Sequence, residues 1–192
     1  MKCAGYISIL IILLAACDLV TTRQAEEPTK PSSNFITAHS PEILLRNFEF
    51  SIEEKITENY LACFVDKNFL DKEYKFIPAG EALATNPALN NWDLNSERLF
   101  LENLKANLPE GKNINLSLEN LNESRFSDSV IYVFDYSLVV NSTNKALDGE
   151  YKGSSQMSVY KDSREQWVIV EWRDYKSESS QCWSDLKGRI SN

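Results

Sequence analysis

Two segments of the chain place apolar residues three to four positions apart, which is the spacing of an amphipathic helix. The first begins at Ser40, Pro41 and Glu42, which supply a capping hydroxyl, a proline for the first helical position and an acid for the first turn. One long helix is predicted from there. Its buried face consists of apolar residues spaced by four: Leu44, Phe48, Ile52, Ile56 and Tyr60.

The second helical segment begins at Asn95 or Ser96 and stops at Pro109. Its apolar face carries Leu99, Phe100, Leu104 and Leu108. Between the two helices, from Val65 to Leu94, short apolar runs alternate with proline and glycine breaks. This part of the chain predicts a short strand or irregular packing.

After Gly111 the apolar period changes from about 3.6 residues to about 2, which marks a change from helices to strands. Alternation defines four runs, which begin at Ile114, Val130, Tyr151 and Trp167. The connections between them are short enough for antiparallel neighbours. Helices followed by strands predict an α+β domain in which a curved antiparallel sheet of four or more strands wraps around the N-terminal helices.

The N-terminus has the anatomy of an export signal: one lysine, an apolar run and two small residues. The run is shorter than the roughly 20 residues that a membrane-spanning helix requires. The four residues Leu14-Ala15-Ala16-Cys17 resemble the lipobox of bacterial lipoproteins. This resemblance implies cleavage between Ala16 and Cys17 and a lipid, with fatty acids such as palmitate, on Cys17. The alternatives are an ordinary secretory signal that ends in a chance cysteine and a short uncleaved anchor.

Three regions are therefore predicted: a signal peptide over 1–16, a lipidated N-terminus with a flexible tether over 17–40, and a domain over 41–192. The tether is polar and lacks apolar periodicity, so it cannot bury enough surface to fold. His39, the one histidine, is expected to be a solvated linker residue. The lipid would hold the protein on a membrane outside the cytoplasm, at the periplasmic side or the cell surface.

Charge and composition exclude several functions. With 28 acidic and 20 basic residues the net charge is −8, which gives no footprint for nucleic acid phosphates. An acidic chain also gains nothing from anionic lipids, so membrane attachment depends on the acyl groups. One histidine and six glycines leave little material for a metal site or a phosphate-binding loop. We expect neither a metal nor a cofactor.

The order of elements from Pro41 onward is similar to that of the nuclear transport factor 2-like superfamily. The tail, Trp167 to Asp174 followed by Cys182 to Lys187, is similar to that of lipoprotein members. The resemblance implies a cone-shaped domain with a pocket at its open end. Some members use this pocket for isomerisation, dehydration or cyclisation, and many use it only for binding.

Enzymes of the superfamily place a carboxylate in the pocket, often with a histidine or tyrosine, because proton transfer beside a carbonyl needs a base. The candidates here are Asp66 and Asp174 as carboxylates, with Tyr60 and Tyr136 as phenols. Each has a structural alternative: a turn residue for Asp66, an ion pair at the strand end for Asp174, and core positions for the tyrosines.

An aromatic face is the candidate ligand-binding surface of the pocket. It carries Tyr132, Phe134 and Tyr136 from one predicted strand and Trp172 from another. Which face of the last strand turns inward is left open, because Trp167 and Ile169 compete with Val168, Val170 and Trp172.

Cys63 and Cys182 are the remaining thiols of the predicted domain. An exported compartment favours a disulfide between them, and two separate buried thiols are the alternative. Two cysteines without a second histidine do not make a zinc site.

Three functional hypotheses follow. The first is a non-enzymatic membrane lipoprotein that binds a small ligand or a protein partner. The second is an isomerase or lyase that uses a pocket carboxylate with a tyrosine. The third is an assembly or scaffolding subunit that forms a homodimer through the second face of the sheet, where Ile131, Val133 and Val139 would supply the apolar contact.

Overall fold

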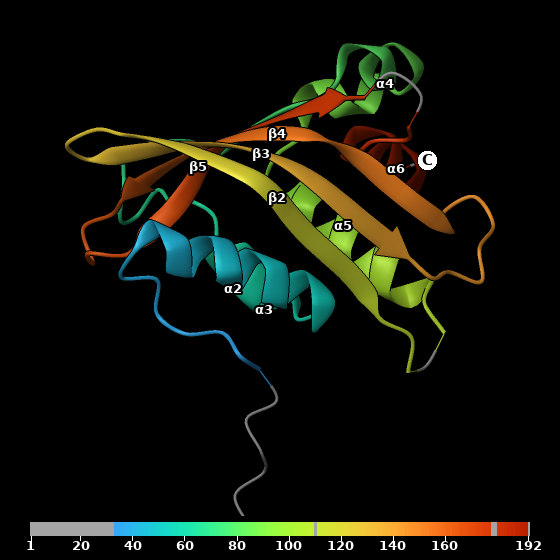
Figure 1. The fold of residues 1–192 in the computed structure, drawn as a ribbon, viewed down its shortest axis with the longest axis horizontal. Helices are drawn as coiled ribbons and strands as arrows, with labels where there is room; N and C mark the ends of the chain where they lie inside the picture. Colours follow the sequence, from blue (N-terminus) through green and yellow to red (C-terminus); the bar gives the residue numbers. More distant parts are fainter. Residues whose placement is uncertain (1–32, 110, 178–179, 192) are drawn as a thin grey trace, which may run out of the picture. The chain divides into compact units, whose positions relative to one another are not determined.

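In the computed structural model of the chain, five strands form one mixed sheet in the order β1-β5-β4-β3-β2 (Figure 1). The structure describes residues 33–109, 111–177 and 180–191, all within the unit Ser33–Asn192. The predicted signal peptide, the cleavage site at Ala16 and the lipidation site at Cys17 lie outside the described residues. No helix of the described part has the length and apolar character needed to cross a membrane.

The elements follow the predicted order of helices first and long strands second. The helices are α2 (Pro41–Glu53), α3 (Thr57–Ala62), α4 (Gly80–Thr85), the short 3-10 helix η2 (Pro87–Asn91), α5 (Leu94–Ala106) and α6 (Trp183–Ile190). The strands are β1 (Lys75–Ile77), β2 (Ile114–Arg125), β3 (Ser129–Val140), β4 (Gly149–Lys161) and β5 (Trp167–Lys176). The α+β class is confirmed.

The first predicted helix is interrupted. It begins as expected, with the Ser40 hydroxyl accepting a hydrogen bond from the Ile43 amide, but α2 ends at Glu53. Lys55 adopts a left-handed conformation with φ of 58°, and α3 starts at Thr57. The apolar spacing by four continues through this break, which explains why the pattern alone predicts one helix.

The sheet differs from the predicted one by a short edge strand. β1 pairs with β5 in parallel, with Phe76 opposite Trp172, while the four long strands are antiparallel neighbours. β1 has three residues and therefore shows no alternation that could be recognised in the sequence. It comes from the segment between the helices in which a short strand or irregular packing was predicted.

A bulge in the β4–β5 pairing answers the question of which face of β5 turns inward. The register shifts between Ser158 and Val159, so that Val168 and Ile169 are both buried. Beyond the bulge, Trp172 and Asp174 point toward the helices and are buried. The inward face of β3 carries the alternating apolar residues predicted from the sequence: Val130, Tyr132, Phe134, Tyr136, Leu138 and Val140.

An aromatic cluster fills the space between the helices and the sheet. The ring of Phe48 on α2 packs against Tyr60, Phe64, Trp172 and Trp183. Trp183 begins α6, and its ring centroid lies 4.8 Å from that of Trp172. The last helix therefore contributes directly to the core.

The domain begins earlier than Pro41, so the predicted tether is wrong for residues 33–40. The hydroxyl of Ser33 donates to the Glu54 carboxylate at 2.6 Å. Buried Asn47 bonds the backbone of Ile36, and the Trp167 amide donates to the carbonyl of Ala38 at 2.8 Å. The segment lies along α2 because polar side chains of the domain satisfy its backbone groups. His39 is exposed.

Candidate functional site

Asp174 is the first of two buried carboxylates in the interior of the domain. It is 2% exposed and accepts a hydrogen bond from the Tyr136 hydroxyl at 2.7 Å. Its other oxygen accepts from the Ser184 amide at 2.7 Å and from the Ser184 hydroxyl at 2.5 Å. All of its partners are neutral donors, and two of them belong to α6. The predicted ion pair with Arg173 or Lys176 is not formed, because those side chains bind Glu171, Glu81 and Asp185 instead.

Glu97 is the second buried carboxylate, and it was not among the candidates from the sequence. It lies in the first turn of α5 and is fully buried. The Lys187 ammonium of α6 donates to it at 2.5 Å, and the hydroxyls of Tyr60 and Tyr74 donate at 2.8 Å and 2.5 Å. An acid in a first helical turn normally faces solvent and interacts with the helix dipole, so its burial could not be recognised from the residue pattern.

Lys187 is surrounded by aromatic rings as well as by this carboxylate. Its Nζ lies 3.7 Å from the ring centroid of Phe76 and 3.9 Å from that of Trp172. The rings of Trp92 and Phe100 are at 5.2 Å and 5.6 Å. Its side chain is 0% exposed. A cation on the faces of several rings is stabilised by their quadrupoles, most strongly where water is excluded.

Burial determines the proton affinities of both clusters. It lowers the pKa of Lys187 to about 8, although Glu97 opposes the shift. Burial, and then the neighbouring Glu97 charge, raise the pKa values of Tyr60 and Tyr74 well above 10. Burial and the Asp174 charge do the same for the pKa of Tyr136. All three phenols therefore stay protonated at neutral pH and serve as donors to the carboxylates.

The four residues of the predicted aromatic surface are all buried: Tyr132, Phe134, Tyr136 and Trp172. Trp172 donates from Nε1 to Ser155 at 3.0 Å, and Trp183 packs edge-on against Tyr136 and Trp172. Trp183 of α6 thus occupies the space next to Tyr136 and Trp172.

Asp66 lies apart from both clusters and is exposed. Its carboxylate accepts hydrogen bonds from the backbone and side chain of Asn68, both at 2.9 Å. This is the arrangement of a turn residue, and it brings Asp66 together with neither Tyr60 nor Tyr136.

The two cysteines of the domain are free thiols, so the disulfide alternative does not hold in this structure. Both are buried, and burial raises the pKa of each well above its ordinary value. Cys63 donates to the carbonyl of Asn59, and Cys182 precedes the first residue of α6. Among residues 33–109, 111–177 and 180–191, no cluster of three histidine, cysteine or acidic side chains could hold a metal ion.

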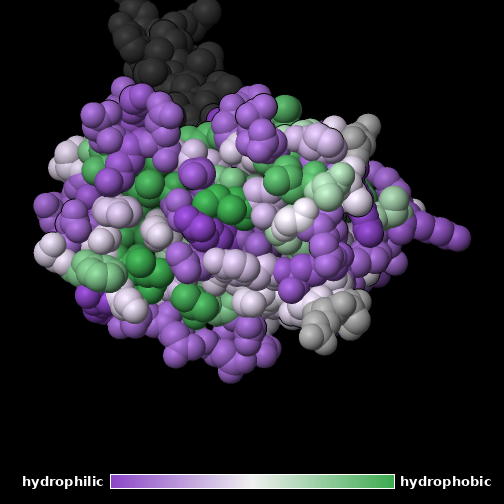
Figure 2. Space-filling view, turned by 90° about the horizontal axis from the view of Figure 1, so that it is seen from above, coloured by the Kyte–Doolittle hydropathy of each residue, from purple (hydrophilic) through white to green (hydrophobic). Residues whose placement is uncertain are grey.

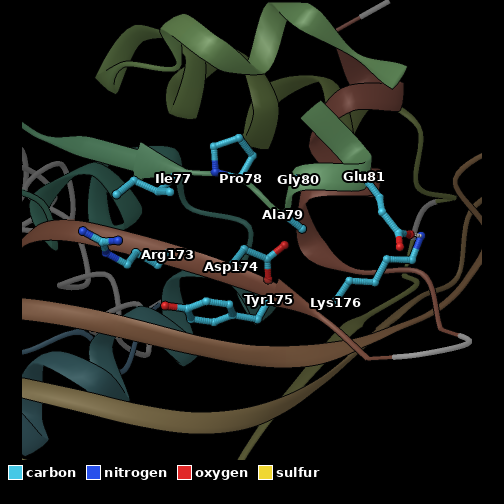
Figure 3. A pocket seen from close by; sticks show the side chains of 9 residues that line it. All are labelled: Ile77, Pro78, Ala79, Gly80, Glu81, Arg173, Asp174, Tyr175 and Lys176. Carbon is cyan, nitrogen blue, oxygen red and sulfur yellow. Dashed lines mark ion pairs between the residues drawn. The ribbon is translucent and has the colours of Figure 1, made fainter. Parts of the chain in front are cut away.

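A surface groove of about 390 Å³ lies next to Asp174 (Figure 3). It is formed where the chain leaves β1 and diverges from β5, and its lining consists of Ile77 to Glu81 and Arg173 to Lys176. Lys176 and Glu81 form an ion pair across it at 3.3 Å. The buried side of the Asp174 carboxylate is bonded to Ser184, so the groove borders the interior cluster without opening it.

Comparison with solved structures identifies the fold. A proposed scytalone dehydratase from Novosphingobium aromaticivorans aligns with a TM-score of 0.53 and 15% identity, over 74% of this chain and 89% of its own. A proposed dehydratase of the nuclear transport factor 2-like family from Streptomyces avermitilis aligns with a TM-score of 0.53 and 10% identity, over 72% of this chain and 94% of its own. A protein of the nuclear transport factor 2-like superfamily from Salmonella enterica aligns with a TM-score of 0.52 and 11% identity, over 71% of this chain and 89% of its own.

The domain has the nuclear transport factor 2-like fold. No protein-family model and no curated protein sequence matches the chain. At 10 to 15% identity these likenesses establish the fold alone. In this nuclear transport factor 2-like domain, function has to be argued from the two buried clusters and the surface.

Proposed function

We propose that this chain is a membrane-anchored lipoprotein whose domain binds a small ligand or a protein partner outside the cytoplasm without catalysing a reaction. The observation that carries the proposal is the state of the two interior carboxylates. Glu97 is bound by Lys187, Tyr60 and Tyr74, and Asp174 by Tyr136 and Ser184. A general base must reach the proton of a substrate. Here the carboxylate oxygens of both residues are already bonded to other groups of the same domain.

The sequence supports the anchor. Leu14-Ala15-Ala16-Cys17 matches the lipobox at all four positions. The folded domain begins at Ser33. Fifteen residues lie between Cys17 and Ser33, and a chain of this length is long enough to reach from a lipid anchor to the domain, because an extended chain spans roughly 3.3 Å per residue. Several acyl chains make such an attachment durable.

The enzyme alternative uses Asp174 with Tyr136. These two groups do lie together, at 2.7 Å, and some proteins of this fold are proposed dehydratases. For Asp174 to act as a base, α6 would have to move away and release both Ser184 contacts. Asp66 with Tyr60 does not form a pair that could support the same chemistry.

Assembly into a homodimer through the outer face of the sheet is another candidate function. Val133 is 42% exposed and Tyr175 is 47% exposed on that face, and Ile131 and Val139 are half-buried. Figure 2 shows the molecule from above, turned by 90° from Figure 1. On this side, hydrophobic residues form small patches that are separated by hydrophilic residues. Sedimentation of a Val133→Glu variant beside the wild type tests this assembly, because a charge in the contact would leave only monomers.

Two experiments test the proposed function. The anchor is tested by labelling cells with radioactive palmitate: the full chain should carry label and sediment with membranes, and Cys17→Ser should do neither. Equal labelling of the two would overturn the anchor.

The closed interior is tested by coupling carboxylates to glycine ethyl ester with a carbodiimide and mapping the products. Exposed Asp66 and Glu81 should react while Glu97 and Asp174 stay unmodified. Rapid modification of either buried acid would favour an enzyme.

A further inference from the structure

The surroundings of Lys187 are a complete receptor for an ammonium ion. The carboxylate of Glu97 comes from α5, where Tyr60 of α3 and Tyr74 hold both of its oxygens. The two nearest rings come from the sheet: Phe76 from β1 and Trp172 from β5. We call these residues, with Trp92 and Phe100, the ammonium cage.

Only the ammonium itself is supplied by α6. The carboxylate and the rings of the ammonium cage all belong to other parts of the chain. A carboxylate with several ring faces is the set of groups that recognises a primary ammonium: an anion for charge, acceptor oxygens for N–H donors, and quadrupoles around the remaining surface. A neutral or anionic ligand would leave Glu97 buried without a counter-charge, which is costly.

The ammonium cage also borders the surface. A pocket of about 200 Å³ lies where η2, α5 and the end of α6 meet, and Trp92 and Phe100 line both this pocket and the cage. Its remaining lining includes Leu99, Ile190 and Ser191. A small molecule that approached along this pocket would meet two of the cage rings.

We propose that the interior of this domain is a binding site for a small primary amine, and that Lys187 is an internal ligand that fills the site in this structure. This inference deepens the proposed binding function and rests on it. It assigns the ligand class as a primary alkylammonium whose aliphatic part is about as long as the lysine stem. An amine that binds takes the place of the Lys187 ammonium between Glu97 and the rings.

The site can be emptied without removing α6. Lys187→Ala deletes three methylenes and the ammonium, whereas the amide of Trp183 still donates to Tyr136 at 2.7 Å and Ser184 still donates to Asp174. The deleted atoms correspond to n-propylamine. The probe is therefore n-propylammonium chloride at pH 7, and 1-propanol and sodium chloride serve as controls for size and ionic strength.

In the full chain carrying Lys187→Ala, n-propylammonium should raise the thermal unfolding midpoint and restore the near-ultraviolet circular dichroism of the aromatic core. At about ten times its Kd the rise should be about 3 °C for a domain of this size. Neither control compound should have this effect. Wild type should respond only at a higher amine concentration, because the amine has to displace the Lys187 ammonium from Glu97, and a wild type that never responds would overturn the proposal. Lys187→Met should not respond, because the methionine stem fills the space.

The double variant Glu97→Gln/Lys187→Ala separates recognition of charge from filling of a cavity. It keeps the cavity and removes the anion, so n-propylammonium should lose most of its effect there. If 1-propanol stabilises Lys187→Ala as much as the amine does, or if the double variant responds equally, the ammonium site is refuted. Should Lys187→Ala fold only with the amine, the amine-dependent yield is the supporting result; failure to fold in both conditions counts against the proposal. None of these failures would change the carboxylate-coupling or palmitate results that test the proposed function.

Discussion

The two interior carboxylates show two ways of burying a negative charge in one domain. Asp174 has neutral donors only: a phenol, a hydroxyl and a backbone amide. Glu97 has two phenols and a full counter-charge, Lys187, which is 90 residues away in sequence. Both carboxylates hold α6, Asp174 at its first turn and Glu97 farther along the helix. The comparison suggests that α6 is fixed at two points, of which the charged one is more sensitive to loss of a partner.

The largest effect is expected when this charged pair is broken. Lys187→Met leaves Glu97 buried without a counter-charge, and loss of one partner of a buried ion pair costs about 3–5 kcal/mol. Adding Glu97→Gln should recover much of this loss, since the amide oxygen still accepts from Tyr60 or Tyr74. Urea unfolding of the two single variants and the double variant measures the coupling. Additive losses would contradict a direct interaction.

A smaller loss is expected at the neutral-donor site. Asp174→Asn keeps one acceptor oxygen but turns an amide group toward the donors of Ser184 or Tyr136. One buried donor is then left unsatisfied, at a cost of about 1–3 kcal/mol. Unfolding in urea gives the value, and Ser184→Ala is the matched change on the other side of the contact. A loss larger than that of Lys187→Met would reverse the proposed order of the two sites.

The fold could be predicted largely from local patterns, and the charged pair could not. Ser40 and Pro41 mark the start of α2, and the alternation in β3 identifies the face that is buried. Asp174 could be named because it falls on a strand whose inward face was one of two options. Glu97 and Lys187 could not, because a glutamate in a first turn and a lysine in a last turn are what an exposed helix also carries. Their burial depends on how β1 and α6 pack, and β1 is too short to show a period.

The charged pair should also make stability depend on pH in a way that the neutral-donor site does not. The pKa of Lys187 is about 8 in the folded protein and has its ordinary value, near 10.4, in the unfolded chain. Between these values the unfolded chain binds more protons, so the free energy of unfolding should rise with pH. The rise should be about 1 kcal/mol between pH 8 and pH 9.

The reference for this measurement is Glu97→Gln/Lys187→Met, which lacks both charges but keeps Cys63, Cys182 and the tyrosines. The free energy of unfolding of both proteins is measured in urea from pH 7 to pH 9.5. The difference between wild type and this variant then removes the contribution of the thiols. The upper limit stays below pH 10, where the raised pKa values of Tyr60 and Tyr74 would begin to lower stability. A difference that falls as pH rises would contradict the assigned shift.

The smallest effect is expected for the exposed carboxylate. Asp66→Asn keeps the side-chain oxygen that accepts from Asn68, and surface substitutions usually change stability by less than about 0.5 kcal/mol. Comparing its unfolding midpoint with that of Asp174→Asn tests whether these two sequence candidates have the different roles assigned to them. Equal losses would show that Asp66 has a structural role that its exposure does not suggest.

A closed interior requires α6 to be a stable part of the domain, because Ser184 and Lys187 of this helix bond the two carboxylates. Hydrogen–deuterium exchange of the unmodified protein, read by mass spectrometry over Trp183–Ile190, measures this directly. We expect the amides of α6 to exchange within about tenfold of those of β3, since both should open only when the domain unfolds. Exchange of α6 a thousandfold faster than β3 would show that the interior opens in the native state, would free Asp174 and Glu97 for chemistry, and would contradict a closed binding domain.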